Sequence, residues 1–308
     1  MPFGSKQGMS GDWLAVAVHA DRIDLVRVER RAVGRPAVRL CESAPNKGSE
    51  VEALVRLRKA HNPRSVRCSS LLKTGQYQMQ LVEAPPVPQA EMRQAVRWKL
   101  KDLLDFPVEA ATVDVVPVPG PAEGVARAQY VYAVSARNDA IGARMRLFHE
   151  ARFPLEAIDV PEMAQRNIAR LFEEPDRAVA LLAIDERGGL LTFTSGGMLY
   201  LSRYTDIGLA QLAAPSAELR EQARERLVLE LQRSLDHFDR QFGFLGVARL
   251  LLAPMPPHDL QPYLAEHLYL PVQAIDLAEV LDFPGAPELR DPQHQAAHLH
   301  LLGAALRE

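Results

Sequence analysis

One acidic residue of this chain, Asp185, stands where a metal-bound phosphate could be held. It follows an apolar run at residues 179–184 and precedes two adjacent glycines, Gly188 and Gly189. A carboxylate at the end of a buried strand can hold a metal ion, and glycine amides can approach phosphate oxygens closely. The same residues are also typical of an ordinary turn. From these residues alone, the turn is the interpretation that we favour.

Two further groups of residues have types and spacing that could do chemistry. Ser70 and Lys73 form an SxxK and Lys73 begins a KTG, but the penicillin-binding enzymes use different lysines for the two motifs and also carry a Ser-Asp-Asn. His294 and His298 share a helix face at i, i+4, without an acidic third ligand at matching spacing. We therefore interpret the first group as a surface turn and the second as a solvated helix face. No GxSxG, HExxH, Walker A or GxGxxG is present.

The composition restricts the class of protein. The 308 residues carry a net charge of −3 without a basic domain, which argues against a nucleic-acid partner. Cys41 and Cys68 lack metal-ligand spacing, and two thiols in a chain of this length suggest a reducing compartment. Neither an apolar signal region nor a run of eighteen apolar residues occurs. We expect a cytoplasmic protein.

The pattern of apolar residues predicts a strand meander at residues 178–208. Glycine turns at Gly188-Gly189 and Ser195-Gly196-Gly197 separate three β-rich runs, and we expect paired positive-φ glycines at these turns. The other predicted strands are residues 13–18, 23–29, 38–41, 65–70, 129–134, 155–160, 247–253 and 272–275. The predicted helices begin at Ser49 (a capping box), Asn138, Glu162, Ser216, Asp259 and Asp291. In the helix after Asn138 we expect Met145 to face inward, and in the one after Ser216, Leu219.

The order of these elements repeats. Each half reads three strands, a helix, a strand, a helix and a strand, although the two halves share no detectable residue identity. Such an order predicts an α/β fold in which each half has a mixed sheet flanked by helices. We place the first lobe at residues 1–172 and the second at 173–308, with the last helix, about 292–307, packing back toward the first lobe.

An inserted subdomain interrupts the first lobe at about residues 77–127. Its helix, 89–104, carries Met92, Val96, Leu100 and Leu103 on one face. Residues 112–118 form an edge strand, because prolines 117 and 119 cannot donate to a ladder. Trp98 lies off the apolar face. It could be an anchor for a partner, but we favour an aromatic buried under the insertion.

Three stretches together resemble the actin-like PilM family of type IV pilus assembly proteins. They are the strand–bend–strand that begins each half, the helix at residues 230–236 and the terminal Gly-Ala-Ala-Leu-Arg at 303–307. Residues 83–119 are similar, more narrowly, to the MshI branch from biogenesis of the mannose-sensitive haemagglutinin (MSHA) pilus. The resemblance implies an actin-like duplication of the ribonuclease H type. It also implies a scaffold at the inner face of the inner membrane, which binds the short cytoplasmic tail of a single-pass, PilN-like partner.

The chain departs from the family pattern in the three loops that bind the nucleotide in ATP-binding members. ATP-binding members have an Asp-Ile-Gly after the first strand, where this chain has Ala17, Val18 and His19. At the second loop Asp185 is kept but Arg187 replaces the glycine, and the adenosine loop at residues 253–257 holds prolines in place of Gly-Gly.

Because these changes remove backbone donors, we expect a non-catalytic pseudo-ATPase without a cofactor. The alternative is a switch or weak ATPase in which Asp185, Gly188, Gly189 and Gly208 hold ATP and Mg²⁺. For the partner, the candidate contacts are Met92, Val96, Trp98 and Leu100. Whether the protein forms a homo-oligomer stays open.

Overall fold

A computed structural model describes residues 11–63, 66–120, 129–256 and 259–308. Three features of the sequence analysis lie outside these ranges: Ser65 at the start of a predicted strand, Pro257 of the third loop, and the end of the predicted insertion near Arg127. Within the described ranges, every helix is too short or too polar to cross a lipid bilayer.

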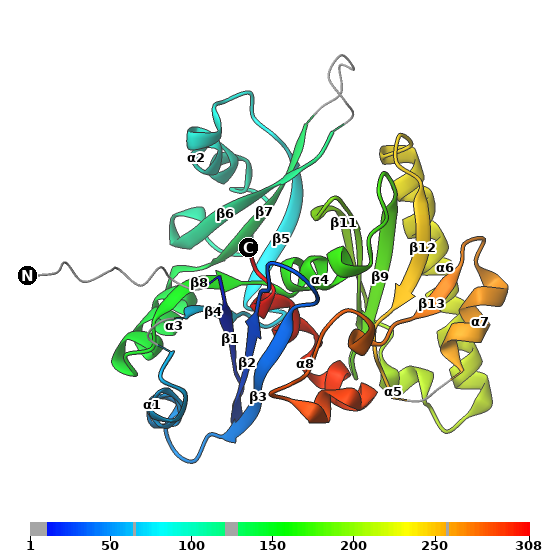
Figure 1. Ribbon diagram of the computed structural model, residues 1–308. Helices are drawn as coiled ribbons and strands as arrows, with labels where there is room; N and C mark the ends of the chain where they lie inside the picture. Colours follow the sequence, from blue (N-terminus) through cyan, green and yellow to red (C-terminus); the bar gives the residue numbers. More distant parts are fainter. Residues whose placement is uncertain (1–10, 64–65, 121–128, 257–258) are drawn as a thin grey trace, which may run out of the picture.

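Two five-stranded sheets of the same topology form the frame of the molecule (Figure 1). The first has the order β3-β2-β1-β4-β8 and the second β11-β10-β9-β12-β13. In each, an antiparallel three-strand meander continues into parallel strands. The first sheet is β1 (Trp13–Val18), β2 (Arg22–Glu29), β3 (Ala37–Pro45), β4 (Arg67–Leu71) and β8 (Leu155–Asp159). The second is β9 (Ala178–Ile184), β10 (Gly189–Ser195), β11 (Met198–Thr205), β12 (Val247–Leu252) and β13 (Val272–Ala274). The predicted repeat of topology is confirmed.

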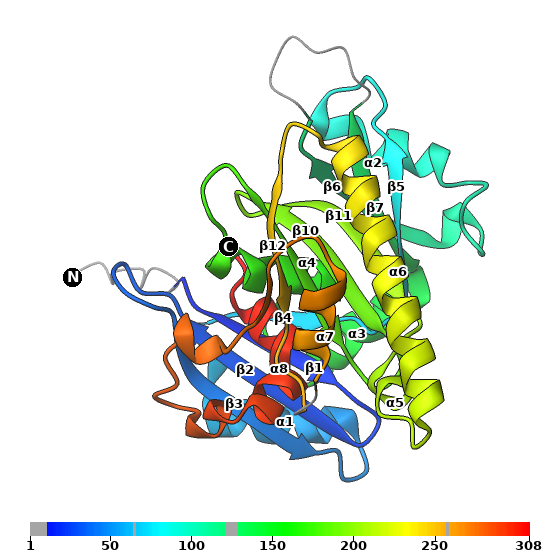
Figure 2. The ribbon, with the colours of Figure 1, turned by 90° about the vertical axis from the view of Figure 1, so that its right-hand side faces the viewer.

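Helices cover both faces of each sheet, so the central strands are buried throughout. Along β1, Leu14 and Val16 face the outer helices α1 (Glu50–His61) and α3 (Asn138–Glu150), whereas Ala15 faces the space between the sheets. Helices α6 (Ala217–Gln241) and α7 (Leu260–His267) pack on the outer face of the second sheet, and α5 (Leu209–Leu212) precedes them. Figure 2 shows α6 lying along that face, with the inserted subdomain behind its upper end.

Between the two sheets lie α4 (Pro161–Ala169) and α8 (Pro292–Ala305), which cross in close contact (Figures 1 and 2). Gly303 makes this approach possible, because a Cβ at that position would collide with the backbone carbonyl of Ala164. Asn167 Nδ2 also donates to the carbonyl of Gly303 at 2.9 Å. Helix α8 thus lies against β1 and β2 of the first sheet, while α4 lies against β9 and β10 of the second.

The insertion forms a third sheet with the order β5-β7-β6. Its strands are β5 (Tyr77–Glu83), β6 (Ala111–Val118) and β7 (Tyr130–Arg137). The strand predicted at residues 129–134 therefore pairs within the insertion rather than with the first lobe, and the inserted unit reaches beyond residue 127. The edge position predicted for residues 112–118 is confirmed. The division of the lobes at residue 172 stays a prediction.

Several local predictions were wrong, and for Asn138 the reason is another hydrogen-bond partner. Ser49 precedes α1 without a capping hydrogen bond. Asn138 is the first residue of α3 rather than its cap, and its side chain accepts from Thr112 Oγ1 at 2.8 Å. Met145 and Leu219, predicted to face inward, are exposed. The caps at Ser216 and Asp291 are confirmed, each accepting an amide hydrogen bond from the first turn.

Candidate functional site

The carboxylate of Asp185 holds its own turn. Its Oδ1 accepts the backbone N–H groups of Arg187 at 2.7 Å and Gly188 at 3.0 Å, and its carbonyl accepts the N–H of Leu209 at 2.8 Å. Two of the amides that would face a phosphate in this loop are thus directed at a side chain of the same loop. The interpretation of Asp185 as a turn residue is confirmed.

The glycines beside Asp185 serve close packing rather than an unusual backbone. Gly188 and Gly189 do not have positive φ, contrary to the prediction, whereas Gly196 and Gly197 have φ of 57° and 71°. A Cβ on Gly188 would collide with the Tyr204 side chain, and one on Gly208 would collide with the backbone of residues 186–187. The chain itself therefore fills the space next to these amides.

An ion-pair cluster stabilises the first bend, between β1 and β2. Asp24 is buried, and it pairs with His19 Nε2 at 3.0 Å and with Arg22 Nε at 3.1 Å. Burial alone would raise the pKa of Asp24, but hydrogen bonds from His19 and Ser43 and the positive charges of His19 and Arg22 lower it to about 2. The negative charge of this carboxylate is therefore balanced by its own neighbours, His19 and Arg22. Sequence reasoning missed it, although the flanking His19 and Arg22 were a signal.

A buried polar network occupies the space between α4, α8 and the second sheet. Gln165 is fully buried, and its Nε2 donates to the carbonyls of Leu181 and Leu190 and to Thr192 Oγ1 at 2.7–3.0 Å. Its Oε1 lies 3.1 Å from His300 Nε2. Burial lowers the pKa of His300 to about 4, against the opposing charge of Asp185. At neutral pH an uncharged imidazole therefore lies within electrostatic range of Asp185.

These contacts test whether the three loops fit Mg-ATP. The first bend has its carboxylate paired and no glycine, and the second directs its amides at Asp185. At the third, Pro254 and Pro256 lack N–H groups, and Ala253 N donates to the carbonyl of Leu182. The residues of the three loops therefore do not fit Mg-ATP. Within the described part of the chain, no cluster of three His, Cys, Asp or Glu is arranged for a metal ion.

The fold of the chain resembles solved structures of known proteins. No family model matches the chain, and no curated protein matches it in sequence. A solved structure of a PilM–PilN type IV pilus biogenesis complex superposes with a TM-score of 0.70 and 20% identity, over 96% of this chain and 98% of that one. A Bacteroides thetaiotaomicron protein with an actin-like ATPase fold and unknown function superposes with a TM-score of 0.50 and 8% identity, over 97% and 99%. The chain has the actin-like fold.

A third similar structure comes from a protein secretion system. The cytoplasmic domain of EpsL, an inner membrane component of the type II secretion system of Vibrio cholerae, matches with a TM-score of 0.52 and 12% identity, over 97% of this chain and 96% of that one. The two sheets correspond to the two lobes of an actin-like fold, so the predicted fold class is confirmed.

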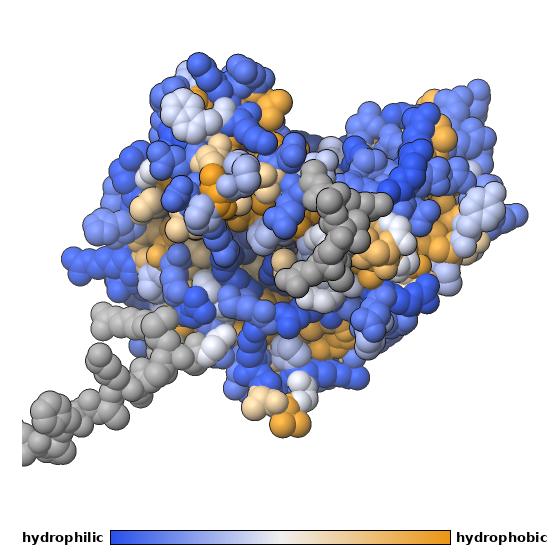
Figure 3. All heavy atoms as spheres, turned by 90° about the horizontal axis from the view of Figure 1, so that it is seen from above, coloured by the Kyte–Doolittle hydropathy of each residue, from blue (hydrophilic) through white to orange (hydrophobic). Residues whose placement is uncertain are grey.

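The inserted subdomain of this actin-like protein carries an exposed aromatic. Trp98, on α2 (Gln89–Lys99), is 72% exposed, so the prediction that it is buried was wrong. It lies at a cavity of about 530 Å³ between α2 on one side and β6 with the short 3-10 helix before it (Val108–Ala110) on the other. The cavity is lined by Arg93, Gln94, Arg97, Trp98, Val108, Glu109 and Val113. Figure 3 shows that the upper face is mainly hydrophilic, with hydrophobic side chains in separate patches.

The other residues predicted to contact the partner, Met92, Val96 and Leu100, differ in how deeply they are buried. Val96 and Leu100 are fully buried in the core between α2 and the third sheet, so they support the helix and cannot face a partner there. Met92 is half-buried at the same core. The predicted helix ends at Lys99, and Leu103 beyond it is exposed. The 3.6-residue period that identified this apolar stripe describes the inner face of α2, and so it could not identify a binding surface.

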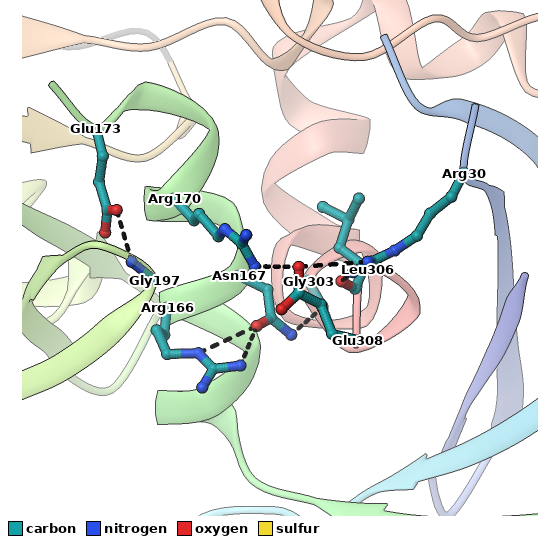
Figure 4. A network of polar contacts seen from close by, with 9 residues as sticks. All are labelled: Arg30, Arg166, Asn167, Arg170, Glu173, Gly197, Gly303, Leu306 and Glu308. Carbon is teal, nitrogen blue, oxygen red and sulfur yellow. Dashed lines mark hydrogen bonds and ion pairs between the residues drawn. The ribbon is translucent and has the colours of Figure 1, made fainter. Parts of the chain in front are cut away.

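A second polar cluster, shown in Figure 4, was not predicted at all. It joins the end of β2, α4 and the end of α8 through Arg30, Asn167, Arg170 and Glu308. Arg30 and Glu308 are separated by 278 residues, so no local pattern indicates their contact.

Proposed function

We propose that this protein is a non-catalytic actin-like scaffold of a type IV pilus assembly platform, of the MSHA type. It resides in the cytoplasm at the inner face of the inner membrane and holds the cytoplasmic tail of a PilN-like membrane partner. The observation that carries the proposal is the match to the PilM–PilN complex over almost the full length of both chains. The resemblance of residues 83–119 to MshI supports the assignment to an MSHA system.

The tail-binding surface that we favour is the cavity between α2 and β6. Its aromatic wall is Trp98, and Arg97 lies beside it with its guanidinium hydrogen-bonded to the carbonyls of Val108 and Glu109 rather than to a carboxylate. Tryptophan and arginine are both enriched among the residues that contribute most of the binding energy at protein interfaces. A short peptide with an apolar anchor and an acidic residue fits this chemistry.

Titration calorimetry with a synthetic peptide of the partner's cytoplasmic tail tests the proposal. We expect saturable binding, and we expect Trp98→Ala to weaken it at least about tenfold while leaving the thermal unfolding midpoint unchanged. Tyr269→Ala is the matched control, because Tyr269 is a fully exposed aromatic of the second lobe. Absence of heat at high peptide concentration would refute the scaffold proposal. Equal affinity of wild type and Trp98→Ala would show that the peptide binds at a different surface.

The alternative function is a nucleotide-dependent switch that uses Asp185, Gly188, Gly189 and Gly208. The contacts of Asp185 within its own turn argue against it. Thermal unfolding with millimolar Mg-ATP separates the two proposals, since a ligand at 100 times its dissociation constant adds about 2.7 kcal/mol to the stability of the folded state. A clear upward shift of the midpoint with Mg-ATP, absent with Mg²⁺ alone, would favour the switch.

A further inference from the structure

Five arginines gather where the end of β2, helix α4 and the end of α8 meet. Arg30 and Arg31 follow β2, Arg166 lies on α4, Arg170 follows α4, and Arg307 follows α8. Arg30, Arg31 and Arg170 line a pocket of about 250 Å³ together with Pro36, Asn167, Leu171, Leu306 and Glu308. The pocket is distinct from the loops considered above. The eight residues of β2 separate Arg30 from the first bend by about 25 Å.

The carboxylates of this region do not balance its positive charge. Arg307 pairs with Asp159 at 2.8 Å and Arg31 with Asp282 at 2.6 Å. Arg30 and Arg170 share a single oxygen, Oε1 of Glu308 (Figure 4). Within the described ranges, Arg166 donates to Asn167 Oδ1 rather than to a carboxylate. Among the described residues, three side-chain carboxylates, those of Asp159, Asp282 and Glu308, thus pair with arginines of this group of five.

Two groups of this region, Arg166 and Glu308, have lowered pKa values. Burial lowers the pKa of Arg166, and the charges of Arg307 and Arg170 lower it further, against the opposing carboxylates of Asp159 and Glu308. For Glu308, burial would raise the pKa, but the hydrogen bonds and charges of Arg170 and Arg30 lower it. The arginines that lower the pKa of Glu308 would stabilise another negative charge at this place in the same way.

The fold holds Arg170 in position from the other lobe. The β10–β11 turn lies against it, because Gly197 has no side chain and a Cβ there would meet Arg170 Cδ at 3.0 Å. Glu173 fixes this turn by accepting the N–H of Gly197 at 2.8 Å (Figure 4). Asn167 is anchored as well, through its hydrogen bond to the carbonyl of Gly303. The pocket is therefore built from several elements, and contacts with Gly197 and Gly303 restrain two of its side chains, Arg170 and Asn167.

We infer that this pocket is a binding site for a phosphate group, and that the side chain of Glu308 occupies the anion position in its absence. Arginine pairs recognise phosphate through several N–H donors at once. The ion pairs of Glu308 are easily exchanged, because its side chain is 55% exposed and exposed ion pairs contribute little. A phosphate bound between Arg30 and Arg170 would join β2 to the connecting segment after α4 more firmly than Glu308 does.

Binding of inorganic phosphate, followed by calorimetry at constant ionic strength, tests the inference. We expect Glu308→Gln to bind phosphate about threefold more tightly, because the internal competitor is removed. The double variant Arg30→Gln/Arg170→Gln should lose at least about tenfold in affinity. Arg226→Gln is the matched control, since Arg226 is an exposed arginine paired with Asp206 on the second lobe. It should bind phosphate like the wild type.

A second arm distinguishes free phosphate from a lipid headgroup. Sedimentation with phosphatidylglycerol vesicles should pull down the wild type, and the double variant less, if the phosphate belongs to a lipid. The inference is overturned if the double variant matches the wild type in both arms, or if Glu308→Gln fails to increase the affinity for either probe. Since partner peptide is absent from both arms, failure here leaves the scaffold proposal unaffected.

Discussion

The hydroxyl of Tyr132 joins the insertion to the second lobe by accepting the backbone N–H of Ser202 at 2.9 Å. Tyr132 lies on β7 and is buried, and Ser202 lies on β11, the edge strand of the second sheet. The same hydroxyl donates to the carbonyl of Tyr200 at 3.5 Å. The inserted subdomain is therefore docked onto the other lobe through a specific polar contact set in an apolar surface.

Removal of this hydroxyl should weaken the docking. In Tyr132→Phe the N–H of Ser202 loses its acceptor, and we expect a loss of about 1–2 kcal/mol in the free energy of unfolding, with faster hydrogen exchange at Ser202. Tyr130→Phe is the control, because Tyr130 lies on the same strand and its side chain is exposed. Equal stability and equal exchange in the two variants would show that the hydroxyl contributes nothing to docking.

Substitution of Asp185 separates a turn role from a metal role. Asp185→Ala removes the acceptor of two amides, and we expect it to lower stability by about 1 kcal/mol in chemical denaturation. Asp185→Asn keeps an acceptor oxygen, so the loss should be smaller. If Asp185 were instead a metal ligand, Asp185→Asn and Asp185→Ala would abolish stabilisation by Mg-ATP to the same extent. The two variants would then not differ in stability without the ligand.

The crossing of α4 and α8 depends on Gly303. A methyl group at this position would collide with the carbonyl of Ala164, so Gly303→Ala must separate the two helices. We expect a loss of about 1–3 kcal/mol, measured by urea denaturation. Gly246→Ala should be close to neutral, because a methyl group there would meet no atom of the described residues within 4 Å and the φ of Gly246 is not positive. A neutral Gly303→Ala would contradict the close approach.

Asp24 should make the fold sensitive to acid. Its pKa is about 2 in the folded state and 3.8 ordinarily, so the ionised carboxylate stabilises the folded protein above pH 4, and this contribution disappears as the pH falls from about 4 to 2. The shift corresponds to about 2 kcal/mol. We expect Asp24→Asn to be less stable than wild type at pH 6, to have lost about half of this difference by pH 3, and to approach wild type near pH 2.

Unfolding free energies at several pH values check this expectation. Asp21→Asn, at an exposed neighbouring position, should leave the acid dependence unchanged. A constant difference between wild type and Asp24→Asn from pH 6 to pH 3 would mean that the ion pairs of Asp24 do not set the acid sensitivity.

The sequence by itself determined the repeated architecture. Alternating and helical periodicities report which face of an element is apolar, and both halves carry them in the same order, so the two sheets and their helices were predictable. The position of Asp185 beside glycines was also enough to favour a turn, because the carboxylate and the amides that it binds are close in the chain.

Only the tertiary structure decided what depends on distant residues. It assigned residues 130–137 to the insertion, exposed Trp98 while burying Val96 and Leu100, and joined Arg30 to Glu308 across 278 residues. Periodicity identifies an apolar face but not the element that covers it, and charge pairing between remote segments leaves no local pattern. The arginine pocket and the Tyr132 contact are therefore properties of the assembled fold, because each joins groups that are far apart in the sequence and meet only when the chain is folded.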